Sequence, residues 1–270
     1  IFVIFILEEN TLTKVKNSKK LLMKLTGDKR ADIKEAFKKP DELGLVPAWS
    51  YSGLKTYESC PYRTYISKVK KVWEEAGPAA ERGSRIHGLA EKYVKGELKE
   101  MPSELKKFAP QFEELHKLFT EGKVEVEGEW GFTLDWETTG WMEHNTWARV
   151  KLDVIVHETE TSARVIDHKT GRKFGNEIAH GQQALTYAIG TFFRYPMLEH
   201  VQTELWYLDK SETTIQAYTR DEAMVFAPGL HQRAVIMTTA TEFPPNPGKD
   251  TCKWCPHKEG EHPICEWGIK

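Results

Sequence analysis

The stretch that most constrains the fold of this chain is residues 164–171, Arg-Val-Ile-Asp-His-Lys-Thr-Gly. Val165 and Ile166 are apolar and β-branched, which predicts a buried strand leading into Asp167. Side chains two apart on a strand point to the same face, so we expect Asp167 and Lys169 to lie side by side where this strand ends. Such a pair can hold a divalent cation and a water molecule, although an exposed ion pair is the plain alternative.

A second carboxylate, Asp153, lies in the strand-like segment that comes before. Residues 146–157 alternate, with Trp147, Arg149, Lys151 and Asp153 on one face and Ala148, Val150, Leu152 and Val154 on the other. A short hairpin at 158–162 would make this segment and 164–169 antiparallel neighbours. Asp153 and Asp167 could then meet at one end of a sheet, where two buried carboxylates repel unless a cation lies between them.

The remaining periodic segments are in an order that predicts a mixed α/β fold. Helices are expected at 50–69 with an interruption at Pro61, and at 79–94, 103–121, 177–194 and 220–241. Further strands are expected at 124–134, 201–207 and 213–218, with a turn at 138–140. A core sheet flanked by helices follows from this order.

Several polar side chains on these helices are candidates for the same site. His87 lies at the edge of the apolar stripe of the second helix, where it is either a boundary histidine or a metal ligand. Gly83 and Gly88 in that helix each cost about 1 kcal/mol relative to alanine, which suggests a close approach to its backbone. Gln183 and Tyr187 share a helix face at i, i+4, where surface hydrogen bonding is their ordinary role.

Composition describes an ordinary globular protein and limits its partners. The 270 residues are 40% hydrophobic and 29% charged, and the formal net charge of −2 means that any nucleic acid must be held by a local basic groove. The apolar run at residues 1–7 is too short to span a bilayer, so we expect no membrane partner and a cytoplasmic location. Residues 1–47 are interpreted as an N-terminal arm, and 1–22 of it as an upstream extension.

Three cysteines, Cys252, Cys255 and Cys265, are concentrated near the end of the sequence, and Cys60 precedes Pro61 far upstream. A CxxC pair with a third cysteine nearby predicts a metal site, with disulfides as the alternative. Four thiolates would suit an iron–sulfur cluster. A zinc site is the other interpretation, and its ligands would be Cys252, Cys255, His262 and Cys265.

Taken in order, His87, Asp153, the Asp167–Gly171 run Asp-His-Lys-Thr-Gly, and Gln183-x-x-x-Tyr187 resemble the RecB-like branch of the PD-(D/E)XK nuclease superfamily. The segment 49–65 looks like the entry helix of that branch, and the cysteine tail is similar to its iron–sulfur staple. The resemblance implies a restriction-endonuclease-like core with a helical cap. It also implies one nuclease domain at 48–267, with the tail 243–267 packed on helix 50–69.

The resemblance assigns a role to each candidate residue. The metal ligands for Mg²⁺ or Mn²⁺ would be His87, Asp153, Asp167 and the backbone carbonyl of His168. Lys169 would position or activate the water, and Gln183 and Tyr187 would contact DNA near the scissile phosphate. Further contacts to the DNA backbone would come from Arg82, Arg85 and Arg149, for which plain surface charge is the alternative. A 4Fe–4S cluster would be held by Cys60, Cys252, Cys255 and Cys265.

The implied function is a metal-dependent DNA nuclease, an exonuclease acting on single strands or free ends in repair, recombination or phage DNA processing. A helicase or recombinase partner and a phage origin are further expectations of the resemblance. A structure-specific endonuclease is the alternative among enzymes. A non-catalytic DNA-binding module with a structural metal is the alternative from another class.

Overall fold

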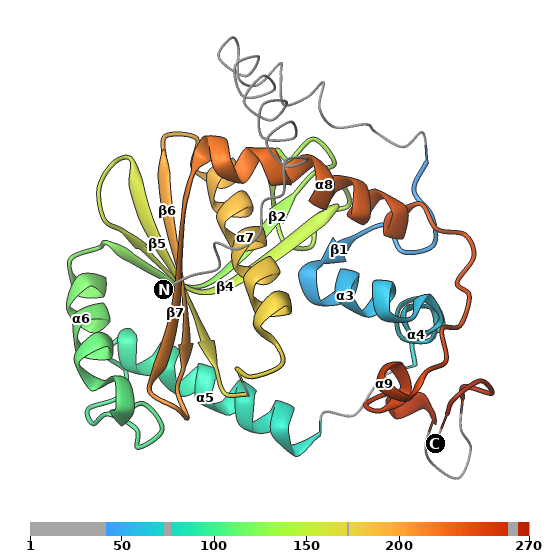
Figure 1. Cartoon of the computed structure of the whole chain (residues 1–270). Coiled ribbons are helices and arrows are strands. Elements are labelled where there is room, and N and C mark those ends of the chain that lie inside the picture. Colours follow the sequence, from blue (N-terminus) through green and yellow to red (C-terminus); the bar gives the residue numbers. More distant parts are fainter. Residues whose placement is uncertain (1–41, 73–76, 172, 259–263, 270) are drawn as a thin grey trace, which may run out of the picture.

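The computed structural model describes residues 42–72, 77–171, 173–258 and 264–269 (Figure 1). Seven strands form one sheet in the order β3-β2-β4-β5-β6-β7, with β1 beside β4. The strands are β1 (Trp49–Ser50), β2 (Val124–Phe132), β3 (Thr138–Thr139), β4 (Ala148–His157), β5 (Ser162–Lys169), β6 (His200–Tyr207) and β7 (Glu212–Thr219). Most of the predicted N-terminal arm lies outside the described residues.

Helices flank this sheet, so the predicted mixed α/β fold is confirmed (Figure 1). The α-helices are α3 (Tyr51–Ser59), α4 (Pro61–Thr64), α5 (Pro78–Val94), α6 (Ala109–Thr120), α7 (Glu177–Arg194), α8 (Arg220–Thr238) and α9 (Lys249–Cys252). Short π and 3₁₀ turns add η1 (Tyr65–Val69), η2 (Lys106–Phe108) and η3 (Pro256–Lys258). The interruption expected at Pro61 is present, because proline lacks the N–H that would continue α3 and instead begins α4.

The sheet changes its direction of pairing at β5. This strand is antiparallel to β4, as the short hairpin predicts, but parallel to β6. A parallel neighbour needs a crossover connection, and α7 provides it. β2 with β4 and β6 with β7 form antiparallel pairs.

Two hydrophobic cores lie on the two faces of the sheet. One packs against α7 and α8 and includes Leu152, Val165, Ile189, Phe192 and Met237. The other packs against α5 and α6 and includes Ile86, Phe112, Val154, Ile166 and Trp206. The sheet is therefore covered on both sides at the strands that carry the predicted site.

Two strands were not foreseen. Thr138 and Thr139, expected in a turn, pair as β3 with the end of β2. Trp49 and Ser50 pair as β1 with the start of β4, and the Ser50 side chain then accepts a hydrogen bond from Gly53 N at 3.3 Å as the N-cap of α3. Both strands have two residues, which is too short to show a period of two.

The C-terminal segment lies against the first helices of the described chain. Asn246 donates a hydrogen bond to the Ser59 carbonyl at 2.9 Å, and the Trp267 ring packs edge-on against Tyr62 at 4.7 Å. Phe243 contacts Tyr65 with ring centroids 5.6 Å apart. Within the described part of the chain, no helix has the length and apolar character needed to cross a membrane.

Candidate metal centre

β4 and β5 part at the two predicted carboxylates. Their backbone pairing ends at Val154 and Ile166, so that Asp153 and Asp167 are the next residues toward the open end. There, Oδ2 of Asp153 accepts a hydrogen bond from His168 N at 2.6 Å. In a regular antiparallel pair, a backbone carbonyl of the neighbouring strand would accept this hydrogen bond. β5 continues beside β6 and β4 continues beside β2. The two strands thus form a fork, and the carboxylates lie at its junction.

The regular alternation of β4 is interrupted at Asp153. Leu152 packs in the core under α7 and α8, whereas Val154 packs in the core under α5 and α6. The prediction that both lie on one face is therefore wrong. In β2, Val126 pairs with Val154 and Gly128 pairs with Leu152. Glu127 lies between these two residues, and its φ of 52° is uncommon for a residue other than glycine. The irregular pairing directs Asp153 toward α5.

His87 on α5 completes this side of the fork. Its neighbours Ile86, Ala90 and Val94 are buried, which fixes the helix on the sheet with His87 beside Asp153. Nδ1 of His87 lies 2.9 Å from Oδ1 of Asp153. Burial lowers the pKa of His87, but the hydrogen bond and charge of Asp153 outweigh burial and raise it overall. Burial likewise raises the pKa of Asp153, and His87 together with His168 lowers it overall.

Four side chains on the other side of the fork form a closed ring of contacts. Tyr187 donates to Oδ1 of Asp167 at 2.8 Å, and Nζ of Lys169 lies 2.7 Å from Oδ2. Lys169 also donates to Oε1 of Gln183 at 2.7 Å, and Nε2 of Gln183 donates to the Tyr187 hydroxyl at 2.6 Å. Burial and the charge of Asp153 raise the pKa of Asp167, while Lys169 opposes that shift. Tyr187 is only 6% exposed and its hydroxyl contacts Asp167 and Gln183, so its contact with DNA stays a prediction.

The structure gives each predicted arginine a protein partner. Arg82 binds both carboxylate oxygens of Asp209, at 2.7 and 3.1 Å. Arg85 pairs with Glu104 at 2.7 Å, and Arg149 donates to the Trp141 carbonyl at 3.0 Å. Arg82 also donates to the carbonyl of Thr170 at 3.4 Å, one residue beyond Lys169. The role of these three arginines in DNA binding stays a prediction.

The two glycines of α5 differ in their surroundings. A Cβ atom at Gly83 would lie 3.2 Å from Oγ1 of Thr170, so the close approach that the sequence suggested comes from the end of β5. At Gly88, apart from its two chain neighbours and the nearby backbone of its own helix, no atom of the described chain lies within 4 Å of the corresponding position. Gly83 therefore serves packing between α5 and the site, and Gly88 faces open space.

Sequence reasoning missed two features near the fork. The side chain of His168 lies beside the site, and donor atoms of His87, Asp153 and His168 lie within 4.8 Å of one another. His180, one turn before Gln183 on α7, contacts the Tyr207 hydroxyl at 2.8 Å. Burial lowers the pKa of His180 to about 4, and the nearby charges of Lys169 and Lys55 add to this shift. The helical spacing of His180 from Gln183 was the available signal.

The residues at the fork fit a divalent cation. The charge of Asp153 raises the pKa of Asp167, so the two carboxylates are near each other, and His87 and Lys169 contact them. The donor atoms that lie within 4.8 Å of one another are those of His87, Asp153 and His168, and Asp167 is not among them. Oxygen and imidazole donors of this kind bind Mg²⁺, Mn²⁺ and related ions. In addition, Nε2 of the buried His168 has no hydrogen-bond partner among the described residues. The donor set of His87, Asp153 and His168 is therefore suitable for a metal.

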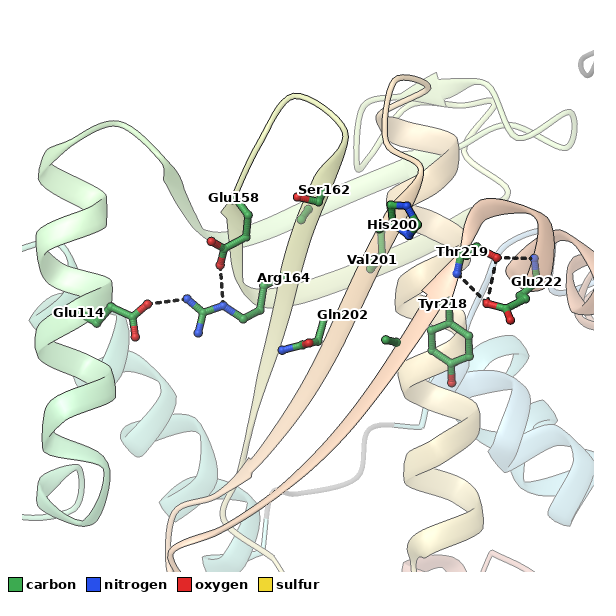
Figure 2. A pocket seen from close by; sticks show the side chains of 12 residues that line it. Glu114, Glu158, Ser162, Arg164, His200, Val201, Gln202, Tyr218, Thr219 and Glu222 are labelled. Atoms are coloured by element: carbon green, nitrogen blue, oxygen red, sulfur yellow. Dashed lines mark hydrogen bonds and ion pairs between the residues drawn. The ribbon is translucent and has the colours of Figure 1, made fainter. Parts of the chain in front are cut away.

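A pocket of about 560 Å³ lies at the opposite end of β5 from Asp167 (Figure 2). Arg164 stands in it and pairs with Glu114 of α6 at 2.7 Å and with Glu158 at 2.9 Å. The guanidinium charge is thus balanced by carboxylates of the chain. The pocket contains none of the side chains of the fork and is not part of the candidate centre.

The four cysteines come together in the structure. A small pocket between α4 and the C-terminal segment is lined by all of them, Cys60, Cys252, Cys255 and Cys265. All four are free thiols, so the disulfide alternative is not formed here. Burial raises the pKa of the Cys255 thiol. His262, the predicted zinc ligand, lies outside the described residues.

Comparison with known proteins adds a family match. The sequence pattern of the family described as the PD-(D/E)XK nuclease superfamily matches residues 48–260 of this chain. A solved structure titled "Crystal structure of SSO0001" aligns with 94% of this chain and 98% of its own, at 16% identity and a TM-score of 0.44. The comparison with curated proteins gave no match. The matched residues include every side chain at the fork.

Proposed function

This chain belongs to the PD-(D/E)XK nuclease superfamily, and we propose that the fork between β4 and β5 is its active site for metal-dependent hydrolysis of DNA. The mixed sheet with flanking helices is the restriction-endonuclease-like fold of that superfamily. The observation that carries the proposal is the convergence of two buried carboxylates, a lysine and a histidine at one break in strand pairing. These groups come from α5, β4 and β5, so no single segment explains their meeting.

We propose that Asp153, Asp167 and His87 hold the cation together with the carbonyl of His168. On a strand, the N–H and C=O of one residue point toward the same neighbour. The N–H of His168 points to Asp153, and the carbonyl of Lys169 is bonded on the other side to Leu208 N at 3.0 Å. The carbonyl of His168 is therefore directed into the fork. The bound ion would polarise the phosphoryl oxygen and lower the pKa of a water.

Lys169 and the residues around it prepare the site for the phosphate. The ammonium of Lys169 is placed to stabilise negative charge that develops on the phosphoryl oxygens and to orient the attacking water. Gln183 holds that ammonium, and Tyr187 holds the carboxylate of Asp167 in the same ring. Attack of water on phosphorus forms one P–O bond, breaks the bond to the 3′ oxygen and leaves a 5′-phosphate. Contact of Gln183 with DNA is part of the proposal.

We propose further that the enzyme is an exonuclease of the RecB-like branch that acts on free ends or single strands. This finer assignment is supported by the order of the motifs from His87 to Tyr187. The proposal takes residues 48–267 as one nuclease domain and repair, recombination or phage DNA processing as its setting, with a helicase or recombinase as partner. The contacts of the C-terminal segment with Ser59 and Tyr62 support a single domain.

The test is digestion of end-labelled linear DNA, single- and double-stranded, beside closed circles of the same sequence, with Mg²⁺ or Mn²⁺. An exonuclease degrades the linear DNA and spares the circles, and cutting of circles would favour the endonuclease alternative. Asp153→Asn and Lys169→Met should abolish cleavage, whereas Lys123→Met, which changes an exposed lysine paired with Glu121, should not. Undiminished cleavage by Lys169→Met would refute the assigned site. DNA binding without any cleavage would favour the non-catalytic alternative.

We propose that the four cysteines bind a 4Fe–4S cluster that joins the C-terminal segment to α3 and α4. Support comes from their free thiols and their shared pocket. Cys60 is near the start of the nuclease domain in sequence, and the other three cysteines are near its end. Visible absorption with bound iron is expected, and Cys60→Ser should remove both. A colourless protein with stoichiometric zinc, kept in Cys60→Ser and lost in His262→Ala, would instead establish the zinc site.

A further inference from the structure

The side chain of His168 is buried in the core between the sheet and helices α5 and α6. Its ring centroid lies 5.2 Å from that of Phe112 and 5.6 Å from that of Trp206, and the residue is only 3% exposed. A buried imidazole ordinarily has hydrogen-bond partners, because an unpaired polar atom away from water lowers stability. Nε2 of His168 has no such partner in the described part of the chain. Packing alone does not explain why a histidine occupies this position.

The other nitrogen of the same ring is near the carboxylate of Asp153. Nδ1 of His168 lies 3.7 Å from Oδ2, beyond hydrogen-bond distance, and Nδ1 of His87 lies 2.9 Å from Oδ1. The planes of the two rings are inclined at 67°, with centroids 5.9 Å apart. Asp153 therefore has one imidazole beside each of its oxygens. In the described part of the chain, Asp153 is hydrogen-bonded to the ring of His87 but not to that of His168, and an ion between the two rings and Asp153 would complete the arrangement.

The spacing of these donors suits one ion. One donor atom from each of the three side chains lies within 4.8 Å of the other two. Adjacent ligands of an ion with bonds of about 2.1 Å are about 3 Å apart, and opposite ligands about 4.2 Å. Only a small closing movement is needed, and Asp153 is at the fork, where β4 and β5 are no longer joined by backbone hydrogen bonds.

We propose that the imidazole of His168 is a ligand of the metal centre in its own right, beyond its backbone carbonyl. This inference rests on the proposed function of the fork as a metal site. Two imidazoles, from His87 and His168, then bind the ion beside Asp153, the carboxylate that both rings approach. A centre with two nitrogen ligands selects first-row transition ions such as Mn²⁺ over Mg²⁺, because Mg²⁺ prefers oxygen ligands and retains its water molecules.

The experiment measures metal binding without DNA, so its result does not depend on cleavage. Full-length protein is titrated with Mn²⁺ and with Mg²⁺ by calorimetry, and bound Mn²⁺ is examined by pulsed EPR, which detects the nitrogen of each coordinated imidazole. His168→Phe removes the donor and keeps a planar ring against Phe112 and Trp206. The matched control is His157→Gln, since His157 is on the same strand as Asp153 but pairs with Glu125 outside the centre.

The expected result is nitrogen coupling from two imidazoles in the unmodified protein and from one in His168→Phe. The Kd for Mn²⁺ should rise at least about tenfold in His168→Phe, since changes even beyond the ligands themselves cost 10–100-fold. The Kd for Mg²⁺ should change less, and His157→Gln should match the unmodified protein. Wild-type Mn²⁺ affinity and nitrogen coupling in His168→Phe would overturn the inference.

A second variant keeps the inference falsifiable if His168→Phe does not fold. His87→Ala should retain the coupling of one imidazole, that of His168, and a complete loss of nitrogen coupling would overturn the inference. Asp153→Asn separates it from the proposed function. If Asp153→Asn abolishes metal binding and cleavage while His168→Phe changes neither, the nuclease site stands and the role of His168 falls. If the unmodified protein binds Mg²⁺ but no Mn²⁺, the role of His168 falls, and if it binds neither ion, both proposals fall.

Discussion

Replacing Tyr187 with phenylalanine removes a single hydroxyl from the site and leaves the buried ring in place. That hydroxyl donates to Oδ1 of Asp167 at 2.8 Å and accepts from Nε2 of Gln183 at 2.6 Å. Since Tyr187 is 6% exposed, we expect that water does not readily replace the lost contact. The charged form of Asp167 loses a donor, so its pKa, already raised by burial, should rise further.

The magnitude follows from the kind of hydrogen bond removed. A hydrogen bond to a charged group contributes about 1.5–3 kcal/mol. Groups that hold a metal-binding side chain in place typically change metal affinity by about 10–100-fold, which equals about 1.4–2.8 kcal/mol. The two ranges agree. We therefore expect Tyr187→Phe to raise the Kd for Mn²⁺ by 10–100-fold, as these principles give, and to slow DNA cleavage at limiting metal.

Calorimetric titration with Mn²⁺ measures this effect, and thermal unfolding shows that the variant is folded. Tyr195→Phe is the matched control, because Tyr195 also donates to a carboxylate, that of Glu125 at 2.6 Å, but outside the fork. The control should leave Mn²⁺ affinity unchanged. Unchanged affinity in Tyr187→Phe as well would show that the hydroxyl does not hold Asp167 as a ligand, and the argument from the ring of contacts would be refuted.

Other parts of the chain are open to equally direct tests. Arg220 donates to the carbonyls at the end of α7 and just beyond it, those of Phe192, Tyr195, Pro196 and Leu198. Arg220→Met should lower the free energy of unfolding in urea by about 3 kcal/mol, and a loss below about 1 kcal/mol would contradict that role. Gly88→Ala should raise it by about 1 kcal/mol, since α5 has open space there; a decrease would show otherwise. His180 should titrate by NMR near pH 4, and Lys55→Ala should raise that pKa, whereas an unchanged value would exclude Lys55 as a cause. The pKa of His180 in the folded protein is below the unfolded value of about 6.5, so between these two values the unfolded chain binds more protons. The contribution of His180 to the free energy of unfolding is therefore fully present above about pH 6.5 and is lost as the pH falls toward 4.

The pairing of Asp167 with Lys169 could be predicted from the sequence because it depends on local geometry. The β-branched residues before Asp167 indicate a strand, and the period of two places Lys169 on the same face. The hairpin between β4 and β5 is short enough to bring Asp153 opposite. These expectations need no knowledge of distant segments.

The rest depends on contacts between segments far apart in the chain. The change of face at Asp153 accompanies an unusual backbone conformation at Glu127, on another strand. Arg82 and Arg85 were expected to be available for DNA, but their partners Asp209 and Glu104 are brought near only by the fold. Alternation along β5 places His168 on the face away from Asp167, so its side chain was not considered. Only the packing of α5 shows that this ring lies beside His87.

The fork also determines how the two halves of the sheet can move. One half of the sheet consists of β3, β2 and β4, and the other half of β5, β6 and β7. The backbone hydrogen bonds that join the two halves stop at Val154 and Ile166. A small rotation about that junction would change the distance between Asp153 and Asp167 without breaking a strand pair. If the proposed function is right, ions of different radius would be accommodated by twist, and substitutions at the outer edges of either half would affect the candidate site from a distance.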